Sequence, residues 1–320
     1  MSYLPNPVPR QFRHHPLALA VATALNTGIA LAGGAPTLDL PSLSPTINAV
    51  NAARDSNVAM QFTDVASLTF GQNFMVRGHQ TARYSGVFTG NDSATIAFNP
   101  TALFKPGERI QLSYTGFSGT VWEFIAAVGG GSGLFVDSGE ALGNGTTQSV
   151  ALGDVDNDGD LDLVDGNRGQ PNQVWLNNGA GHFTDSGQPL GSNYTYSVAL
   201  GDVDDDGDLD LVEGNYGQAN RVWLNDGLGM FSDSGQVLGG NTTRSVVLGD
   251  VDGDGDLDLV EGNYGEASRV WLNDGAGHFT DSGQSLGSNT TVSMALGDVD
   301  GDGDLDGVAG NDSNQANRVW

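Results

Sequence analysis

The chain has 320 residues, of which 39 are acidic and 12 are basic, so its formal net charge is −27. A chain this acidic lacks the basic surface that binds nucleic acid or docks on anionic lipid, and we expect neither partner. Cysteine is absent, which excludes disulfides and thiolate metal sites.

The N-terminus has the pattern of a secretory signal peptide. Arg10 and Arg13 precede a run of small, apolar residues (17–32) that ends in Ala30-Leu31-Ala32. A basic segment, an apolar segment and an A-x-A site are the three parts of such a signal. A membrane anchor is the alternative, but the run is shorter than the ~20 apolar residues that a span needs. Residues 1–32 therefore predict secretion or surface display, with no membrane span after cleavage.

A predicted β-sandwich follows a linker. Residues 33–45 are rich in glycine, proline and serine, as linkers are. From residue 46 to residue 128, short runs alternate apolar and polar side chains, most clearly at Val58–Phe62 and Arg109–Tyr114. This period of two is typical of half-buried strands, and seven or so strands in roughly 80 residues predict a β-sandwich.

This segment resembles the bacterial Ig-like domains of the SbsA type. The resemblance is carried by Asn57-Val-Ala-Met-Gln-Phe62, by Thr95-Ile-Ala-Phe-Asn-Pro100 and by Phe104-Lys-Pro-Gly-Glu108. It implies a spacer or an adhesive module and identifies no functional residue.

Residues 129–320 are organised by a repeat. An acidic decapeptide starts at Gly153 and returns at Gly201, Gly249 and Gly297, at intervals of 48 residues. Each unit has about four short alternating runs and a hairpin signal such as Asn178-Gly179. Four strands per unit at this period predict the blades of a β-propeller, because a single four-stranded sheet cannot bury both of its faces.

One tryptophan recurs in each unit, and we interpret this set as core between blades, with a sugar-stacking platform as the alternative: Trp175, Trp223, Trp271 and Trp320. The repeat begins with a half-unit, since Gly133–Gly139 matches Gly181–Gly187, and it stops in mid-unit. Two half-units could share a blade and close a four-bladed ring. We favour the other interpretation, an incomplete part of a seven-bladed propeller.

The decapeptide is a candidate metal loop. In the pattern D-x-D-x-D-G-x-x-D, carboxylates at positions 1, 3, 5 and 9 face inward, position 7 offers its carbonyl, and glycine at position 6 permits a sharp turn. Ca²⁺ takes six to eight oxygen ligands, whereas Mg²⁺ demands an octahedron and is the weaker candidate. We predict about one Ca²⁺ per loop, four in total, held by Asp154, Asp156, Asp158, Asp160 and Asp162; Asp202, Asp204, Asp206, Asp208 and Asp210; Asp250, Asp252, Asp254, Asp256 and Asp258; Asp298, Asp300, Asp302, Asp304 and Asp306.

An EF-hand is the alternative for these loops. The segments from Asp202 to Glu213 and from Asp250 to Glu261 satisfy its consensus. An EF-hand loop joins two amphipathic helices. Here the flanks alternate as strands do, so we expect strands on both sides of each loop.

Residues 133–320 resemble the FG-GAP/VCBS repeats, which build the calcium-loop propellers of integrin α-subunits and of many secreted bacterial proteins. The resemblance rests on Gly-Asp-Val-Asp-x-Asp-Gly-Asp-Leu-Asp, on Val-Trp-Leu-Asn and on Gly-x-Gly-x-Phe. It implies structural calcium, seven blades and binding or adhesion more often than catalysis.

The function expected is that of a secreted or surface-displayed, calcium-binding, non-catalytic repeat protein, which is bacterial if the Ig-like resemblance holds. Its partner would be an extracellular glycan or protein. Two alternatives stay open, the scaffold part of an extracellular enzyme such as a polysaccharide-degrading protein, and a structural surface spacer. The sequence shows no nucleophile elbow, phosphate loop or paired catalytic carboxylates, so we assign no catalytic residue.

Overall fold

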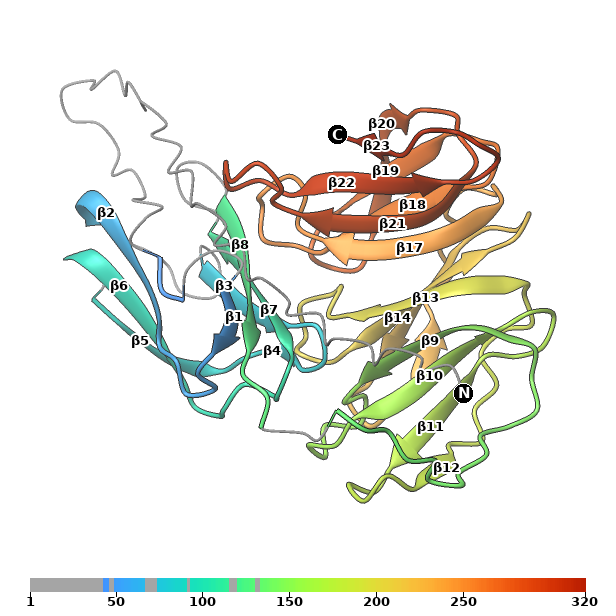
Figure 1. Cartoon of the computed structure of the whole chain (residues 1–320), viewed down its shortest axis with the longest axis horizontal. Coiled ribbons are helices and arrows are strands. Elements are labelled where there is room, and N and C mark those ends of the chain that lie inside the picture. The colour runs from blue at the N-terminus through green and yellow to red at the C-terminus, as the bar shows by residue number, and fades with distance from the viewer. Residues whose placement is uncertain (1–42, 46–48, 67–73, 91–92, 115–119, 130–132) are drawn as a thin grey trace, which may run out of the picture. The chain divides into compact units, whose positions relative to one another are not determined.

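The computed structural model describes residues 43–45, 49–66, 74–90, 93–114, 120–129 and 133–320 (Figure 1). The predicted signal peptide and most of the predicted linker lie outside these residues. The described part of the chain is all β-strand and turn, without a helix, as the alternating patterns predict. It therefore contains no helix that could cross a membrane.

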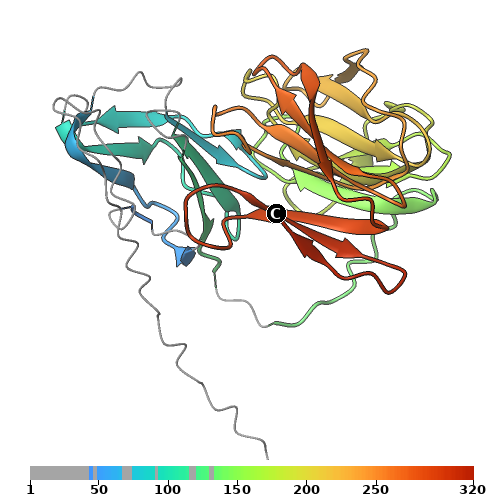
Figure 2. The same cartoon turned by 90° about the horizontal axis from the view of Figure 1, so that it is seen from above.

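Residues 49–126 form two sheets around one core (Figures 1 and 2). The apolar side chains of Met60, Ile96 and Phe98 from the smaller sheet meet those of Ile110 and Leu112 from the larger one, and all five are buried. The alternation of the sequence thus places one face of each sheet inside. The larger sheet has the order β1 (Ala49–Ala52), β8 (Thr120–Ala126), β7 (Arg109–Tyr114), β3 (Phe74–Gly78), β4 (Ala82–Arg83), and the smaller has β2 (Val58–Ala66), β6 (Ser93–Pro100), β5 (Gly86–Thr89).

Each repeat unit forms one antiparallel sheet, and the first three units confirm the prediction of four strands per unit. We number these repeat sheets one to four; the first three have four strands and the fourth has three. They comprise β9 (Thr147–Gly153), β10 (Asp162–Asn167), β11 (Gln173–Asn177) and β12 (Phe183–Asp185); β13 (Thr195–Gly201), β14 (Asp210–Asn215), β15 (Arg221–Asn225) and β16 (Phe231–Asp233); β17 (Thr243–Gly249), β18 (Asp258–Asn263), β19 (Ser268–Asn273) and β20 (Phe279–Leu286); β21 (Thr291–Gly297), β22 (Asp306–Asn311) and β23 (Arg318–Val319).

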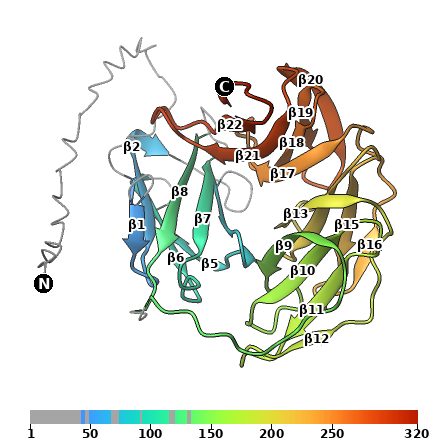
Figure 3. The ribbon, with the colours of Figure 1, turned by 45° about the vertical axis from the view of Figure 1, so that its right-hand side comes forward.

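Successive repeat sheets bury their faces against each other. Val164 and Val174 of the first sheet share a core with Val198, Leu211 and Phe231 of the second. The first strands of neighbouring sheets, β9, β13, β17 and β21, lie side by side (Figure 3). This stacking supplies the second face that one sheet lacks.

The recurring tryptophans follow the predicted core role where a neighbouring sheet is present. Trp175 and Trp271 are buried, and Trp223 is half-buried and packs with the core of the first two sheets. Trp320 is 40% exposed. These side chains are therefore packing residues in the described structure, and the stacking platform suggested as an alternative is not formed by them.

The leading half-unit does not form a strand. Phe135 is completely exposed, whereas its counterparts Phe231 and Phe279 are each 7% exposed. Those two phenylalanines start strands that pair within a sheet and pack on the preceding repeat sheet. Residues 133–139 form no strand of the described sheets, so they add none to the three-stranded fourth sheet. The shared blade of a four-bladed ring is absent from the described residues.

Candidate metal sites

Each acidic loop joins the first two strands of a repeat sheet. The four loops connect β9 to β10, β13 to β14, β17 to β18 and β21 to β22. Strands therefore flank every loop, which excludes the EF-hand interpretation. Glu213 and Glu261, which would be its bidentate glutamates, lie inside β14 and β18 instead.

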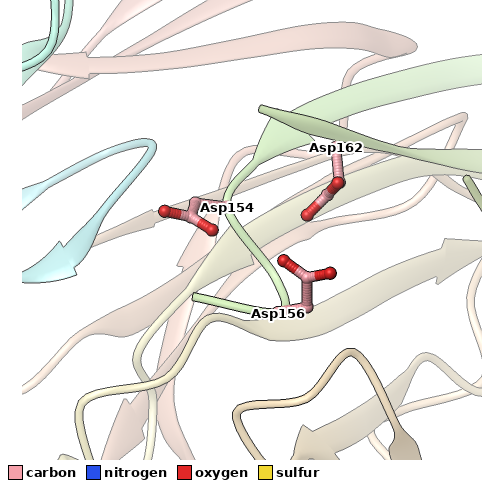
Figure 4. A group of neighbouring side chains, drawn as sticks. All are labelled: Asp154, Asp156 and Asp162. Atoms are coloured by element: carbon pink, nitrogen blue, oxygen red, sulfur yellow. The ribbon is translucent and has the colours of Figure 1, made fainter. Parts of the chain in front are cut away.

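Three carboxylates converge in each loop. In the first loop, oxygens of Asp154, Asp156 and Asp162 lie within 4.8 Å of one another, and the side chains turn toward a common space (Figure 4). The other triads combine positions 1, 3 and 5 and consist of Asp202, Asp204 and Asp206; Asp250, Asp252 and Asp254; Asp298, Asp300 and Asp302. Each loop thus gathers three of the four carboxylates predicted to face inward. Position 5 is outside the triad in the first loop, and position 9 is outside it in the others.

Two left-handed residues bend each loop. The glycines at position 6, which are Gly159, Gly207, Gly255 and Gly303, have φ from 97° to 101°, a conformation that side chains with a Cβ disfavour. Position 4 is also left-handed, with φ of 59° at Asn157, 61° at Asp205, 76° at Gly253 and 80° at Gly301. The sequence analysis overlooked this second bend, although Asn, Asp and Gly are the residue types that tolerate it.

The ninth aspartate ties the loop to the sheet. In the second loop, Oδ2 of Asp210 accepts the backbone N–H of Val203 at 2.9 Å, and Oδ1 accepts that of Asn225 at 2.9 Å. Asp162 and Asp258 accept the matching pairs of N–H groups in their own loops. The loop ends are therefore fixed to two strands by one buried carboxylate.

The seventh aspartate directs its side chain away from the triad. A Cβ placed on Gly179 would lie 2.3 Å from Oδ2 of Asp160, and one on Gly227 would lie 2.5 Å from Oδ2 of Asp208. These side chains therefore cover the hairpin turn of the same sheet. Such an orientation is compatible with the prediction that position 7 offers only its backbone.

Burial makes these carboxylates hard to ionise. It raises the pKa of Asp162 to about 6, that of Asp210 to about 8 and that of Asp258 to about 7. Burial likewise raises the pKa of Asp202 and of Asp250 to about 6. Two backbone N–H groups lower the pKa of Asp162, Asp210 and Asp258, but burial outweighs them. A divalent cation would reverse this balance, because it stabilises the ionised form directly.

The residues present fit a hard divalent cation. Oδ1 of Asp154 and Oδ2 of Asp202 are buried and have no hydrogen-bond partner among the described residues. An unpaired buried oxygen is costly, and a bound ion is one of its ordinary explanations. The four triads contain only carboxylates, the donor type that Ca²⁺ prefers.

Asparagines connect the second and the third loop each to the preceding one, a role that the sequence analysis missed. Nδ2 of Asn225 donates to the carbonyl of Val155 at 2.8 Å and to that of Leu209 at 3.1 Å. Asn273 makes the same pair of bonds one sheet later. The fixed Asn after Val-Trp-Leu was the available signal.

The comparisons with known proteins match this repeat. A family described as FG-GAP-like repeat matches residues 164–213, 202–261 and 250–309. A search of curated proteins found no match. Solved structures that are similar in part have low identity and low TM-scores, which carry no argument about function.

Three of these structures illustrate how low the similarity is. The N-terminal part of BBS1 in complex with ARL6 is 11% identical with a TM-score of 0.37, and the match covers 81% of each chain. The LD-transpeptidase LdtMt1 with imipenem is 12% identical with a TM-score of 0.24, over 78% of this chain and 81% of that one. A DUF4784 protein from Bacteroides caccae is 6% identical with a TM-score of 0.24, over 86% and 94%. The family match is the informative one, and residues 164–309 carry three FG-GAP-like repeats.

Proposed function

We propose that this chain is an extracellular, non-catalytic repeat protein that binds Ca²⁺ in its four acidic loops and uses the calcium-stabilised sheets for adhesion or ligand binding. The observation that carries the proposal is the fourfold recurrence of a carboxylate triad whose oxygens lie within 4.8 Å of one another. Secretion through residues 1–32, an Ig-like identity of the first domain and a seven-bladed propeller belong to the same proposal.

Calcium in these loops would have a structural role. Each triad sits where two strands of one sheet join, and the ninth aspartate fixes both ends of the loop. Without a cation, several carboxylates crowd into one short turn and repel one another. Binding would therefore be coupled to the folding of the loop, as in other metal-stabilised domains.

Thermal unfolding with and without chelator tests the proposal. EDTA should lower the melting temperature of the full chain, and added Ca²⁺ should restore it, because a ligand that binds only the folded state stabilises it. Isothermal titration of the chelated protein should find four sites, and Mg²⁺ serves as the matched control ion. An unchanged melting temperature in EDTA would remove the calcium assignment.

A further inference from the structure

A cluster of tyrosines surrounds one arginine at the end of the repeat sheets opposite to the acidic loops. The guanidinium carbon of Arg244 lies 4.2 Å from the ring centre of Tyr196, 5.4 Å from that of Tyr216 and 5.0 Å from that of Tyr264. Tyr196 lies in β13 and Arg244 in β17, the first strands of the second and third repeat sheets. Tyr216 directly follows β14, and Tyr264 directly follows β18. We call these four residues the Arg–Tyr cluster.

The cluster lies far from the acidic loops. Tyr196 is near the start of β13, and the second loop begins at Asp202, after the strand ends. Six residues of extended strand span about 20 Å, which exceeds the Debye length of about 8 Å at physiological salt. The loop charges therefore hardly reach an anion that binds at the cluster.

Arg244 has no acidic partner among the described residues, whereas two other arginines of the repeat sheets have one. Arg221 pairs with Asp233 at 3.4 Å and Arg269 pairs with Asp281 at 2.6 Å. With the described residues Arg244 forms neither an ion pair nor a hydrogen bond, and its Nε is buried without a partner. Two acidic side chains at this rim are bound to backbone instead: Glu266 accepts the N–H of Thr242, and Asp312, which takes the place of Tyr264 in the fourth unit, accepts that of Ser313. The guanidinium is thus held by aromatic rings, with its hydrogen-bonding capacity unused.

The tyrosines make the site accessible and flat. Tyr216 is 43% exposed and Tyr264 is 37% exposed. A second pair continues the row, because Arg168 lies 5.8 Å from the ring centre of Tyr194, which is also exposed. Exposed aromatic faces beside a fixed guanidinium suit a ligand that has flat apolar faces and a carboxylate, since the guanidinium matches a carboxylate with two parallel hydrogen bonds.

Backbone groups at this rim are already used. Tyr216 N–H donates to the carbonyl of Tyr194 at 2.9 Å, and Tyr264 N–H donates to that of Thr242 at 2.8 Å. The first bond extends the pairing of β13 with β14 and the second that of β17 with β18, so each lies within one repeat sheet. Gly217 N–H donates to the carbonyl of Asn241 in the next unit at 3.1 Å. A peptide that binds by adding a strand needs free backbone groups, so recognition through side chains, as of a sugar, is favoured.

We propose that the Arg–Tyr cluster binds a uronate-containing glycan, with the sugar rings on the tyrosines and the carboxylate on Arg244. This inference rests on the proposed function, because it names the site and the ligand class of the binding role stated there.

Calorimetric titration of the full, calcium-loaded chain tests it. The probe is a tetrasaccharide in which glucuronate alternates with N-acetylglucosamine, and its carboxyl methyl ester is the neutral match. The acid should bind and the ester should bind at least tenfold more weakly. Arg244→Gln should weaken acid binding by about tenfold or more, and Tyr216→Ala or Tyr264→Ala by about two- to tenfold. Arg269→Gln, which removes an arginine already paired with Asp281, should leave binding unchanged.

Three results would overturn the inference: no binding of the acidic tetrasaccharide, equal binding by Arg244→Gln, or equally tight binding of triglutamate that is insensitive to both tyrosine variants. The last would identify an acidic-peptide site. The melting temperature in EDTA separates this outcome from the proposed function. If calcium stabilises the chain but the sugar does not bind, only the ligand assigned to the Arg–Tyr cluster is refuted. If the sugar binds but the stability does not depend on calcium, only the calcium assignment is refuted.

Discussion

Asn225 offers a direct measurement of how strongly the acidic loops hold neighbouring sheets together. Its amide donates to a carbonyl of its own loop, Leu209, and to a carbonyl of the preceding loop, Val155. The side chain is 5% exposed. Asn177 occupies the same place in the first repeat sheet, where its amide donates only to its own loop, at Leu161. The Nδ2 groups of the two asparagines thus differ by one bond between sheets.

The expected cost follows from these bonds. Asn225→Ala leaves two buried carbonyls without this donor, and a buried polar group without a partner costs about 1–3 kcal/mol. We expect the free energy of unfolding to fall by about 2–4 kcal/mol. Asn177→Ala removes one partly buried bond, to the carbonyl of Leu161, and one exposed bond, in which its Oδ1 accepts the N–H of Gly181, so about 1 kcal/mol is expected.

Urea unfolding of both variants in saturating Ca²⁺ measures the difference. Asn273→Ala is the replicate, because Asn273 bonds to Leu257 and Val203 in the same way. Equal losses for Asn177→Ala and Asn225→Ala would show that the bond between sheets contributes nothing measurable. That result would refute the reasoning that the loops couple neighbouring sheets.

Three further predictions concern the loops and the sheet interior. Gly207→Ala should lower the free energy of unfolding in urea by about 1–2 kcal/mol, because φ is 100° at this residue. Gly240→Ala is the control: its added Cβ would have no atom within 4 Å, and its φ is not left-handed, so the change should be less than about 0.5 kcal/mol. Replacing Asp202 and Asp204 together by Asn should reduce the calcium stoichiometry from four to three in a calorimetric titration, because it dismantles one of the four triads. Burial raises the pKa of Glu213 above its ordinary 4.5. Between the two pKa values the folded protein therefore binds more protons at Glu213 than the unfolded protein does. The stability that Glu213 contributes at low pH is lost as the pH rises through the raised pKa. Glu213→Gln should therefore flatten the fall of melting temperature with pH in saturating Ca²⁺, and an unchanged slope would contradict this.

The repeat made much of the fold predictable. A pattern copied every 48 residues averages out local ambiguity, so the strands, the hairpin turns and the strand–loop–strand setting of the acidic decapeptide followed from the sequence. The left-handed bend at position 6 followed from an invariant glycine. The composition of each carboxylate triad could not be predicted from the sequence, because small differences between the loops decide which aspartates converge. Asp162 joins its triad while Asp210 does not.

Contacts between repeat sheets were beyond the reach of the sequence pattern. Asn225 and Val155 are 70 residues apart, and no local period links them. The failure at Phe135 has the same origin, since its segment resembles the start of a strand but its burial depends on a neighbouring sheet. Local patterns thus predicted the strands of each sheet. Which side chains are buried depends on the packing between sheets, which local patterns do not contain.

The two ends of the first strands follow different rules. The acidic end is the same in every unit, since an aspartate recurs at one position: Asp154, Asp202, Asp250 and Asp298. A loop that every sheet needs for its stability would be repeated in this way. At the opposite end, one strand position is glutamine, tyrosine, arginine and valine in the four units, namely Gln148, Tyr196, Arg244 and Val292. A position that only stabilised the sheet would have the same task in every unit and no reason to vary so widely in charge and shape. The side chains at this position are exposed or half-exposed, so they are instead free to meet a ligand. In the function that we propose, the acidic loops stabilise the sheets, and the opposite rim, where the Arg–Tyr cluster lies, recognises the ligand.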